Sequence, residues 1–147
     1  TEPGRFVTCE SGILLGKVNA IKTNVDKKFI GTDIGMNILM RPVLYDSWHD
    51  IEIIRQNEVI LPDSNVEKVT VVGNICESGD IIANERELPK IEKNDIVAVL
   101  DAGAYGYSMA SNYNMRLRPA EVMIDINGNP VLIRKRDTYE DLFKNFL

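Results

Sequence analysis

The chain has 147 residues, of which 44% are hydrophobic and 27% charged, and its formal net charge is -5 at pH 7. This length and composition are typical of one folded domain and exclude a disordered polypeptide. No segment gathers lysines and arginines into a basic field, which weighs against nucleic acid as a partner. The apolar runs are only a few residues long, so we expect neither a membrane span nor a signal peptide.

The cysteine content points to a reducing environment. Cys9 and Cys76 are too few for a disulfide scaffold, and their spacing is not that of a zinc site, so we expect a cytoplasmic protein without a metal. The chain opens at Thr1 on a Pro-Gly turn rather than at a methionine. We therefore expect that an amino-terminal portion precedes it.

Most predicted elements are short strands. Segments rich in β-branched residues and bounded by turn residues predict strands over residues 13–21, 28–34, 51–55, 66–72 and 96–100. Between the second and third of these, Pro42 predicts the start of a short helix that runs towards His49, because proline suits the first helical turn. Arg41 would lie at the helix entrance, held extended by the proline after it.

The last third of the chain predicts a hairpin and a helix. Strands over 121–126 and 130–134 flank Asn127-Gly128, a dipeptide typical of type I′ turns. Thr138 and Asp141 resemble a capping box, and apolar residues recur behind them at helical spacing. Many strands and few helices favour a mainly β fold, either a β-sandwich or a Greek-key barrel-like domain, with a short internal helix and a C-terminal helix.

Residue types able to do chemistry follow two of the predicted strands. Cys76, Glu77 and Asp80 follow the strand over 66–72, and Tyr105 lies among glycines after the strand over 96–100. Loops at strand ends are where sites are usually built, and glycine lets the backbone approach a ligand. Separately, the fork of an arginine guanidinium matches a carboxylate, so Arg41 and Tyr45, four apart at a helix start, could hold such a group.

Each of these residues also has a structural interpretation. Cys76 could be a small buried apolar residue, and Glu77 and Asp80 could be solvated loop acids. Tyr105 could be a core or rim aromatic, and His49 a helix-end residue rather than a general base. From residue types alone, the sequence indicates a β-rich domain with an anion site and names no reaction.

Several short motifs along nearly the whole chain nevertheless resemble those of one family, and they occur in the same order. Glu2-Pro3-Gly4-Arg5 resembles the turn that ends the barrel of fold-type III pyridoxal-phosphate-dependent decarboxylases. The diaminopimelate decarboxylases of that family have signature segments similar to Asp33-Ile-Gly-Met-Asn37, Met40-Arg-Pro-Val-Leu-Tyr45 with Trp48-His49, Cys76-Glu-Ser-Gly-Asp80 and Asp101-Ala-Gly-Ala-Tyr105-Gly.

The resemblance implies a carboxy-lyase that converts meso-2,6-diaminopimelate to L-lysine, with pyridoxal 5'-phosphate as electron sink. Residues 1–147 would be its single C-terminal β-domain, and residues 1–12 approximately the junction with an N-terminal (β/α)8 barrel. The lysine that holds the cofactor as a Schiff base would lie outside this chain, so the isolated fragment should be inactive. A homodimer with shared active sites is also implied.

The resemblance also implies roles for single residues. Cys76 would be the catalytic proton donor. Arg5, Arg41 and Tyr45 would bind the distal carboxylate of the substrate, and Glu77 its distal ammonium. Cofactor and substrate would contact Tyr105, and the cofactor would also contact Glu2, Pro3, Gly4 and Arg5.

Two alternatives stay open at this point. The first is a related ornithine, arginine or carboxynorspermidine decarboxylase, although Glu77 favours diaminopimelate because an aspartate usually follows the cysteine in ornithine decarboxylases. The second is a non-catalytic β-sandwich binding module.

Overall fold

The computed structural model describes residues 1–62 and 65–147. Contacts divide the chain into two compact units, unit 1 (Thr1–Ala110) and unit 2 (Ser111–Leu147), which are described separately. No helix in the described residues is both long and apolar enough to cross a membrane.

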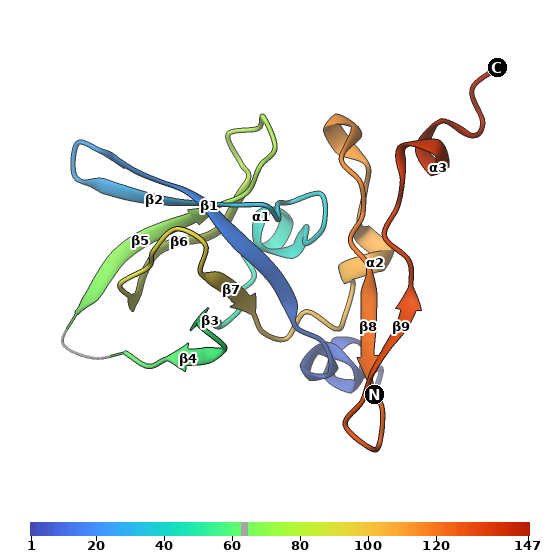
Figure 1. Ribbon diagram of the computed structural model, residues 1–147, viewed down its shortest axis with the longest axis horizontal. Coiled ribbons are helices and arrows are strands. Elements are labelled where there is room, and N and C mark those ends of the chain that lie inside the picture. The colour runs from blue at the N-terminus through green and yellow to red at the C-terminus, as the bar shows by residue number, and fades with distance from the viewer. Residues whose placement is uncertain (63–64) are drawn as a thin grey trace. The chain divides into compact units, whose positions relative to one another are not determined.

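Unit 1 is built mainly from strands (Figure 1). Its strands are β1 (Leu14–Asn24), β2 (Lys27–Thr32), β3 (Ile51–Arg55), β4 (Glu58–Ile60), β5 (Val66–Val72), β6 (Ile81–Pro89) and β7 (Ile96–Val99). Its helical turns are η1 (Arg5–Val7), η2 (Cys9–Ser11), α1 (Arg41–Tyr45) and α2 (Gly106–Met109). The predicted mainly β class is confirmed.

The long strand β1 joins the two halves of the sheet. Its first residues, from Leu14 to Lys17, pair with β7, and the residues from Val18 onward pair with β2, with a register shift between Val18 and Ala20. The sheet order is β4-β3-β7-β1-β2-β5-β6. A strand that passes from one half-sheet to the other at a bulge is a usual way to make the corner of a sandwich or barrel.

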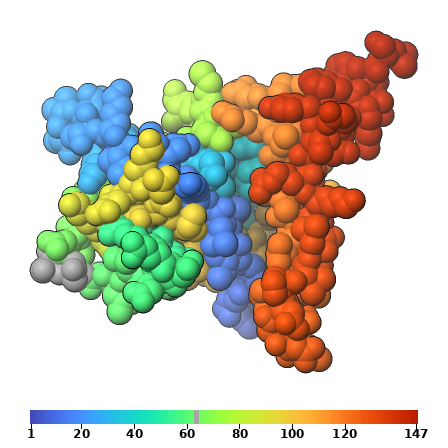
Figure 2. Space-filling view, viewed as in Figure 1, coloured from blue at the N-terminus to red at the C-terminus, as the bar shows by residue number. Residues whose placement is uncertain are grey.

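The core lies between these half-sheets. Fully buried side chains come from both of them, among them Val18, Ile30, Ile53, Val71 and Val97. Figure 2 shows the β3–β4 segment in green beside the yellow β6 segment on one face of unit 1. Residues of both segments line one cleft, so these edge regions of the sheet approach each other, although the described strands β4 and β6 are not paired.

The pairing of β2 with β5 positions the loops that matter below. It is parallel, whereas every other ladder of unit 1 in the described residues is antiparallel. Thr32, at the end of β2, donates its hydroxyl to the carbonyl of Val72, at the end of β5, at 3.0 Å. The segments that follow these two strands therefore begin side by side.

The internal helix differs from the prediction. It ends at Tyr45 instead of continuing towards His49, because Asp46 adopts a left-handed conformation with φ 51°. Arg41 is the first residue of the helix and not an extended residue before it, since the preceding Met40 is already helical. Trp48 and His49 consequently lie in the connection to β3.

Unit 2 contains η3 (Tyr113–Met115), a hairpin of β8 (Glu121–Ile124) and β9 (Pro130–Arg134), and α3 (Tyr139–Phe143). The hairpin is confirmed, but the type I′ turn is wrong, because Gly128 (φ 83°) has a positive φ and Asn127 does not. Asp125 instead accepts the backbone N–H groups of Asn127 and Asn129. The predicted capping box of Thr138 and Asp141 is present.

Asp95 ties β3 to the turn that precedes β7. Its carboxylate is buried and accepts two hydrogen bonds of 2.8 Å from Arg55 and one of 2.7 Å from the Glu92 N–H. Burial raises the pKa of Asp95, but the hydrogen bonds from Arg55 and from the N–H of Glu92, together with the charge of Arg55, outweigh it and hold this pKa below its ordinary value.

We expect Asp95→Asn to lower the free energy of unfolding by about 2 kcal/mol at neutral pH, because it removes a charged hydrogen-bond pair. A depressed folded-state pKa means that this stabilisation is complete above the unfolded pKa of about 3.9 and is lost as the pH falls through the folded value. Urea denaturation of wild type and variant across this range should therefore converge at acid pH. A difference independent of pH would contradict this explanation.

Candidate carboxylate-binding site

The centre of the candidate site is the side chain of Arg41. It is 8% exposed, and its guanidinium donates to the Ser47 hydroxyl at 3.1 Å. The guanidinium carbon lies 5.5 Å from the ring centroid of Tyr45 and 5.5 Å from that of Tyr105. Helical spacing explains the first contact, since residues four apart share a helix face. The second brings together segments about 60 residues apart.

Arg41 has no carboxylate partner among the residues that the structure describes. None of the ion pairs among the described residues involves it. Aromatic faces attract a guanidinium, but an arginine carries its charge at every physiological pH, and a buried charge is costly without a counter-ion. The cluster of Arg41, Tyr45 and Tyr105, here called the Arg41 cluster, therefore suits an incoming anion with a planar carboxylate.

Tyr105 is held in an uncommon backbone conformation. It adopts φ 60° and ψ 12° directly before α2, a left-handed geometry that is rare for an aromatic residue. Such conformations are kept where the surroundings demand them, and they concentrate at functional sites. A Cβ at Gly4 would lie 3.2 Å from the Tyr105 hydroxyl, so this hydroxyl reaches the Glu2–Arg5 turn.

Backbone contacts fix the loop that carries Tyr105. The N–H of Ala102 donates to the Gly12 carbonyl at 2.8 Å, and that of Gly103 to the Cys9 carbonyl at 2.9 Å. A Cβ at Gly12 would lie 2.6 Å from the Cα of Gly103, and a Cβ at Gly103 would collide with the Thr8 carbonyl. Two glycines thus allow the chains to touch, and half-buried Cys9 has a structural role.

Cys76 and Glu77 lie at the tip of the loop between β5 and β6. Both side chains are exposed, so the interpretation of Cys76 as a buried apolar residue is wrong. Exposure leaves the thiol accessible to a reacting partner. Neither side chain hydrogen-bonds to the Arg41 cluster within the described residues, and the Glu77 carboxylate accepts the N–H of Gly79 at 3.3 Å.

Asp80, at the base of this loop, is not the solvated acid that the sequence suggested. It is 4% exposed and accepts the N–H of Met36 at 2.6 Å and that of Ile75 at 2.7 Å. Met36 follows β2 and precedes α1, whereas Ile75 precedes Cys76. The role of Asp80 was not predicted from the sequence, although the residue ends the Cys76–Asp80 segment on which the family resemblance rests.

A hollow of about 470 Å³ lies between α1 and the start of β6. Val43 and Ser47 line it from the α1 side, and Gly79 and Ile81 line it from the other side. The segment that carries Arg41 and the loop that carries Cys76 thus border one space.

The remaining predicted residues lie in the amino-terminal turn. Glu2, Pro3, Gly4 and Arg5 are all exposed. The Gly4 contact with Tyr105 brings this turn to the Arg41 cluster. The exposed Arg5 side chain takes part in none of the ion pairs of the described residues, so its guanidinium is open to a ligand.

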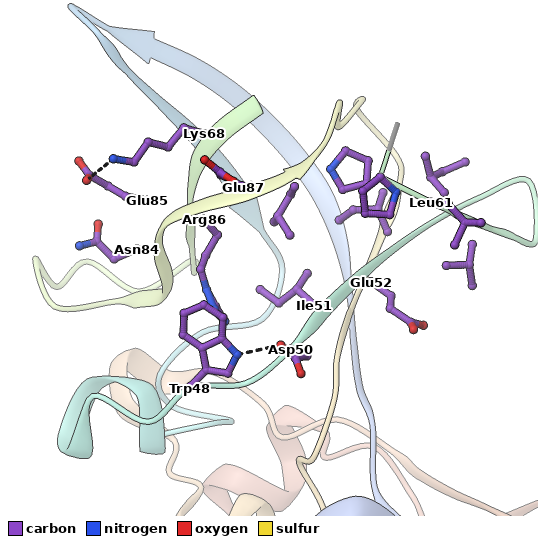
Figure 3. Close-up of a pocket in the computed structure, with 16 residues that line it drawn as sticks. Trp48, Asp50, Ile51, Glu52, Leu61, Lys68, Asn84, Glu85, Arg86 and Glu87 are labelled. Atoms are coloured by element: carbon purple, nitrogen blue, oxygen red, sulfur yellow. Dashed lines mark hydrogen bonds and ion pairs between the residues drawn. The ribbon is translucent and has the colours of Figure 1, made fainter. Parts of the chain in front are cut away.

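A larger cleft, of about 560 Å³, lies elsewhere in unit 1, between the β3–β4 segment and β6 (Figure 3). The buried Arg86 side chain points there towards Trp48, and its guanidinium carbon lies 2.9 Å from a Trp48 ring centroid. Arg86 also donates to the His49 carbonyl. None of the site residues predicted from the sequence lines this cleft.

His49 is part of the framework of unit 1. Its ring is 5% exposed, and Nδ1 lies 2.8 Å from the Leu100 carbonyl oxygen. The expectation that it is not a general base stays a prediction, but its position at a helix end is wrong, because α1 ends four residues earlier.

The architecture defines a sheet domain whose loops, at one edge, present an arginine between tyrosines, a thiol and an acid. Over residues 6–103 the chain matches the family described as pyridoxal-dependent decarboxylase, C-terminal sheet domain. The chain belongs to this family.

Similar proteins support the assignment. The diaminopimelate decarboxylase of Methanothermobacter thermautotrophicus is 43% identical over 97% of this chain and 32% of its own length. A crystal structure of diaminopimelate decarboxylase from M. jannaschii, in complex with L-lysine, superposes with a TM-score of 0.89 at 42% identity, covering 99% of this chain and 32% of that one. The chain thus spans about a third of the length of these relatives.

A more distant structure shares the fold alone. A lysine/ornithine decarboxylase from Vibrio vulnificus, complexed with cadaverine, has a TM-score of 0.65 and 23% identity, and the match covers 78% of this chain and 30% of that one.

We expect Gly103→Ala to destabilise the protein by about 1–3 kcal/mol, because its methyl group meets the backbone of the Thr8–Gly12 segment. Gly106→Ala is the matched control in the same loop, since a Cβ there has nothing within 4 Å, and it should change stability by less than about 0.5 kcal/mol. Denaturant midpoints of both variants check this. Equal effects would show that the close approach of the two backbones does not matter.

Proposed function

We propose that the full-length protein containing this chain is a pyridoxal-phosphate-dependent decarboxylase that converts meso-2,6-diaminopimelate to L-lysine. Residues 1–147 form its C-terminal β-domain, and residues 1–12 form the junction with a (β/α)8 barrel that supplies the cofactor lysine. The family assignment supports the reaction class, and the relatives named diaminopimelate decarboxylase support the substrate.

The proposal is carried by the Arg41 guanidinium, which is buried and has no carboxylate partner in the part of the chain that the structure describes. Diaminopimelate has a second amino-acid centre, distant from the one that reacts, and its carboxylate can take the place of the missing counter-ion. The hydroxyl of Tyr45 and the exposed guanidinium of Arg5 are additional donors for this carboxylate. Ornithine and arginine lack a distal carboxylate, so for them the charge of Arg41 would stay uncompensated.

Cofactor binding on this side of the pocket fits the groups present. The Tyr105 hydroxyl adjoins Gly4, and Arg5 follows, so hydroxyl, amide and guanidinium donors suited to a phosphate ester lie along one turn. Pyridoxal phosphate, when bound, supplies an electron sink for the bond that breaks. Tyr105 and the Glu2–Arg5 turn hold and orient this group, and the rest of its site belongs to the barrel.

Cys76 is the proton donor. After the bond between the α-carbon and the carboxylate breaks and carbon dioxide leaves, Cys76 Sγ gives its proton to that carbon, and the thiolate regains a proton from water. Glu77, the next residue, accepts hydrogen bonds from the distal ammonium of the substrate. Both side chains are exposed at a loop tip, the position needed to act outside their own domain.

An exposed thiol and acid also suit a site shared between subunits. We therefore propose a homodimer in which the Cys76–Glu77 loop of one subunit completes the pocket of the other. The alternative of an ornithine, arginine or carboxynorspermidine decarboxylase is less favoured, because the only such relative described above supports the fold alone. Membership of the decarboxylase family weighs against a free-standing binding module.

Arg41→Lys in the full-length protein should lower kcat/KM for meso-diaminopimelate about 10- to 100-fold, because lysine keeps the charge but loses the planar fork and the ring contacts. Lysine formation and carbon dioxide release measure this, with ornithine and arginine as comparison substrates. Arg55→Lys is the matched control, since it removes a two-pronged guanidinium contact with Asp95 instead. A wild-type protein that is inert on diaminopimelate would refute the proposed function itself.

Cys76→Ala should lower kcat about 100-fold or more, the usual contribution of general acid catalysis, while the absorbance of bound cofactor stays unchanged. Cys9→Ala is the control, because Cys9 contributes its backbone carbonyl to the Gly103 bond and should leave kcat unaffected. Undiminished turnover in Cys76→Ala would exclude this thiol as the donor.

A further inference from the structure

The loop between β5 and β6 is compact and internally bonded. The N–H of Gly73 donates to the Asp80 carbonyl at 3.0 Å, which closes the loop at its base. Further up, the N–H of Asp80 donates to the Glu77 carbonyl at 3.1 Å, and that of Glu77 to the Ile75 carbonyl at 2.8 Å. These internal bonds let the loop behave as one rigid unit. Its orientation therefore depends on the contacts that residues 73–80 make with the rest of unit 1.

The Asp80 carboxylate makes that attachment. One oxygen accepts the N–H of Ile75, the neighbour of Cys76, and the other accepts the N–H of Met36. Met36 precedes Arg41 by five residues, and the Ile38 and Leu39 N–H groups return to the Gly35 carbonyl at 2.9 and 3.1 Å. The buried Asp80 carboxylate thus links the loop of the thiol to the turn that leads to the arginine, beside a second bond from the Asn74 side chain to the Asp33 carbonyl at 3.0 Å.

Two glycines leave room for this carboxylate. A Cβ at Gly35 would lie 2.8 Å from an Asp80 carboxylate oxygen, and one at Gly73 would collide with the same group. No lysine or arginine forms an ion pair with Asp80 in the described residues. Backbone N–H groups alone therefore compensate the charge, and both oxygens are needed as acceptors.

We propose that Asp80 is a positioning residue, whose buried carboxylate sets the Cys76–Glu77 loop relative to the segment that carries Arg41. This inference rests on the proposed function, because it assigns the loop a catalytic thiol. Asp80 itself touches neither substrate nor cofactor. It acts by holding the Cys76 thiol and the Arg41 guanidinium in one arrangement, so that a substrate bound at one presents its α-carbon to the other.

Asp80→Asn is the informative change, because it keeps the volume and removes one acceptor. The amide nitrogen must then face a backbone N–H group, so one of the two attachments is lost. Asp95→Asn is the matched control: Asp95 is also 4% exposed and also accepts a backbone N–H, but it lies before β7, outside this loop. Both variants should lose stability, and only the first should disturb the thiol.

The test uses the full-length protein with Cys9→Ser as background, and it measures kcat, KM, the unfolding midpoint and the rate of Cys76 alkylation by iodoacetamide, located by peptide mass spectrometry. For Asp80→Asn we expect kcat to fall about tenfold or more and the alkylation rate to change at least about threefold. For Asp95→Asn both quantities should match the background protein once the folded fraction is taken into account.

Two results would overturn the proposal: unchanged kcat and alkylation in Asp80→Asn, or equal changes in Asp95→Asn, which would reduce Asp80 to a source of stability. If Asp80→Asn does not fold, Met36→Pro removes the N–H that Met36 donates to Asp80, and unchanged kcat and alkylation in that variant overturn the proposal equally. A failure of the proposed function is distinguishable, because the background protein would then be inactive on diaminopimelate while the alkylation comparison still tests Asp80.

Discussion

The parallel pairing of β2 with β5 is the constraint on which the rest of the site depends. Parallel neighbours end at the same edge of a sheet, so the segment that enters α1 and the loop that carries Cys76 leave their strands side by side. Two hydrogen bonds continue this proximity beyond the ladder, from Thr32 to the Val72 carbonyl and from Asn74 to the Asp33 carbonyl, each 3.0 Å long. An antiparallel partner would have sent one of these segments to the opposite edge.

The pairing of β7 with β1 and β3 brings the loop that carries Tyr105 to the same edge. Leu14, at the start of β1, and Ile51, at the start of β3, both pair with Val99, at the end of β7. The chain before β1 and the chain after β7 therefore meet, and the glycines of that junction let their backbones touch. Tyr105 can then approach Arg41, which comes from a different part of the sheet. The strained backbone of Tyr105 is compatible with this, because many contacts on both sides hold the loop.

Much of this could be predicted from the sequence, and the failures have physical causes. Strands with clear β-branched patterns, such as residues 51–55 and 66–72, were predicted with correct bounds. The strand β6 was missed because its Asn-Glu-Arg-Glu stretch lies on a sheet edge, where polar residues are tolerated. The internal helix was predicted too long, since nothing in the local pattern shows that Asp46 turns left-handed. In the hairpin, the Asp125 carboxylate organises the turn and overrides the preference of Asn127-Gly128.

In the candidate site, too, some features could be predicted from the sequence and others could not. Motifs identified the groups that can do chemistry, because reactive residue types are recognisable one at a time. They did not identify the groups that hold them, since an aspartate such as Asp80 acquires its role only when two distant backbone N–H groups converge on it. The buried charge of Arg41 follows the same logic: its side chain was expected to bind an anion, but only the fold reveals that no carboxylate of the described chain reaches it. If a ligand supplies the counter-ion, as proposed, a domain that buries this cation beside two tyrosines gives up stability for recognition.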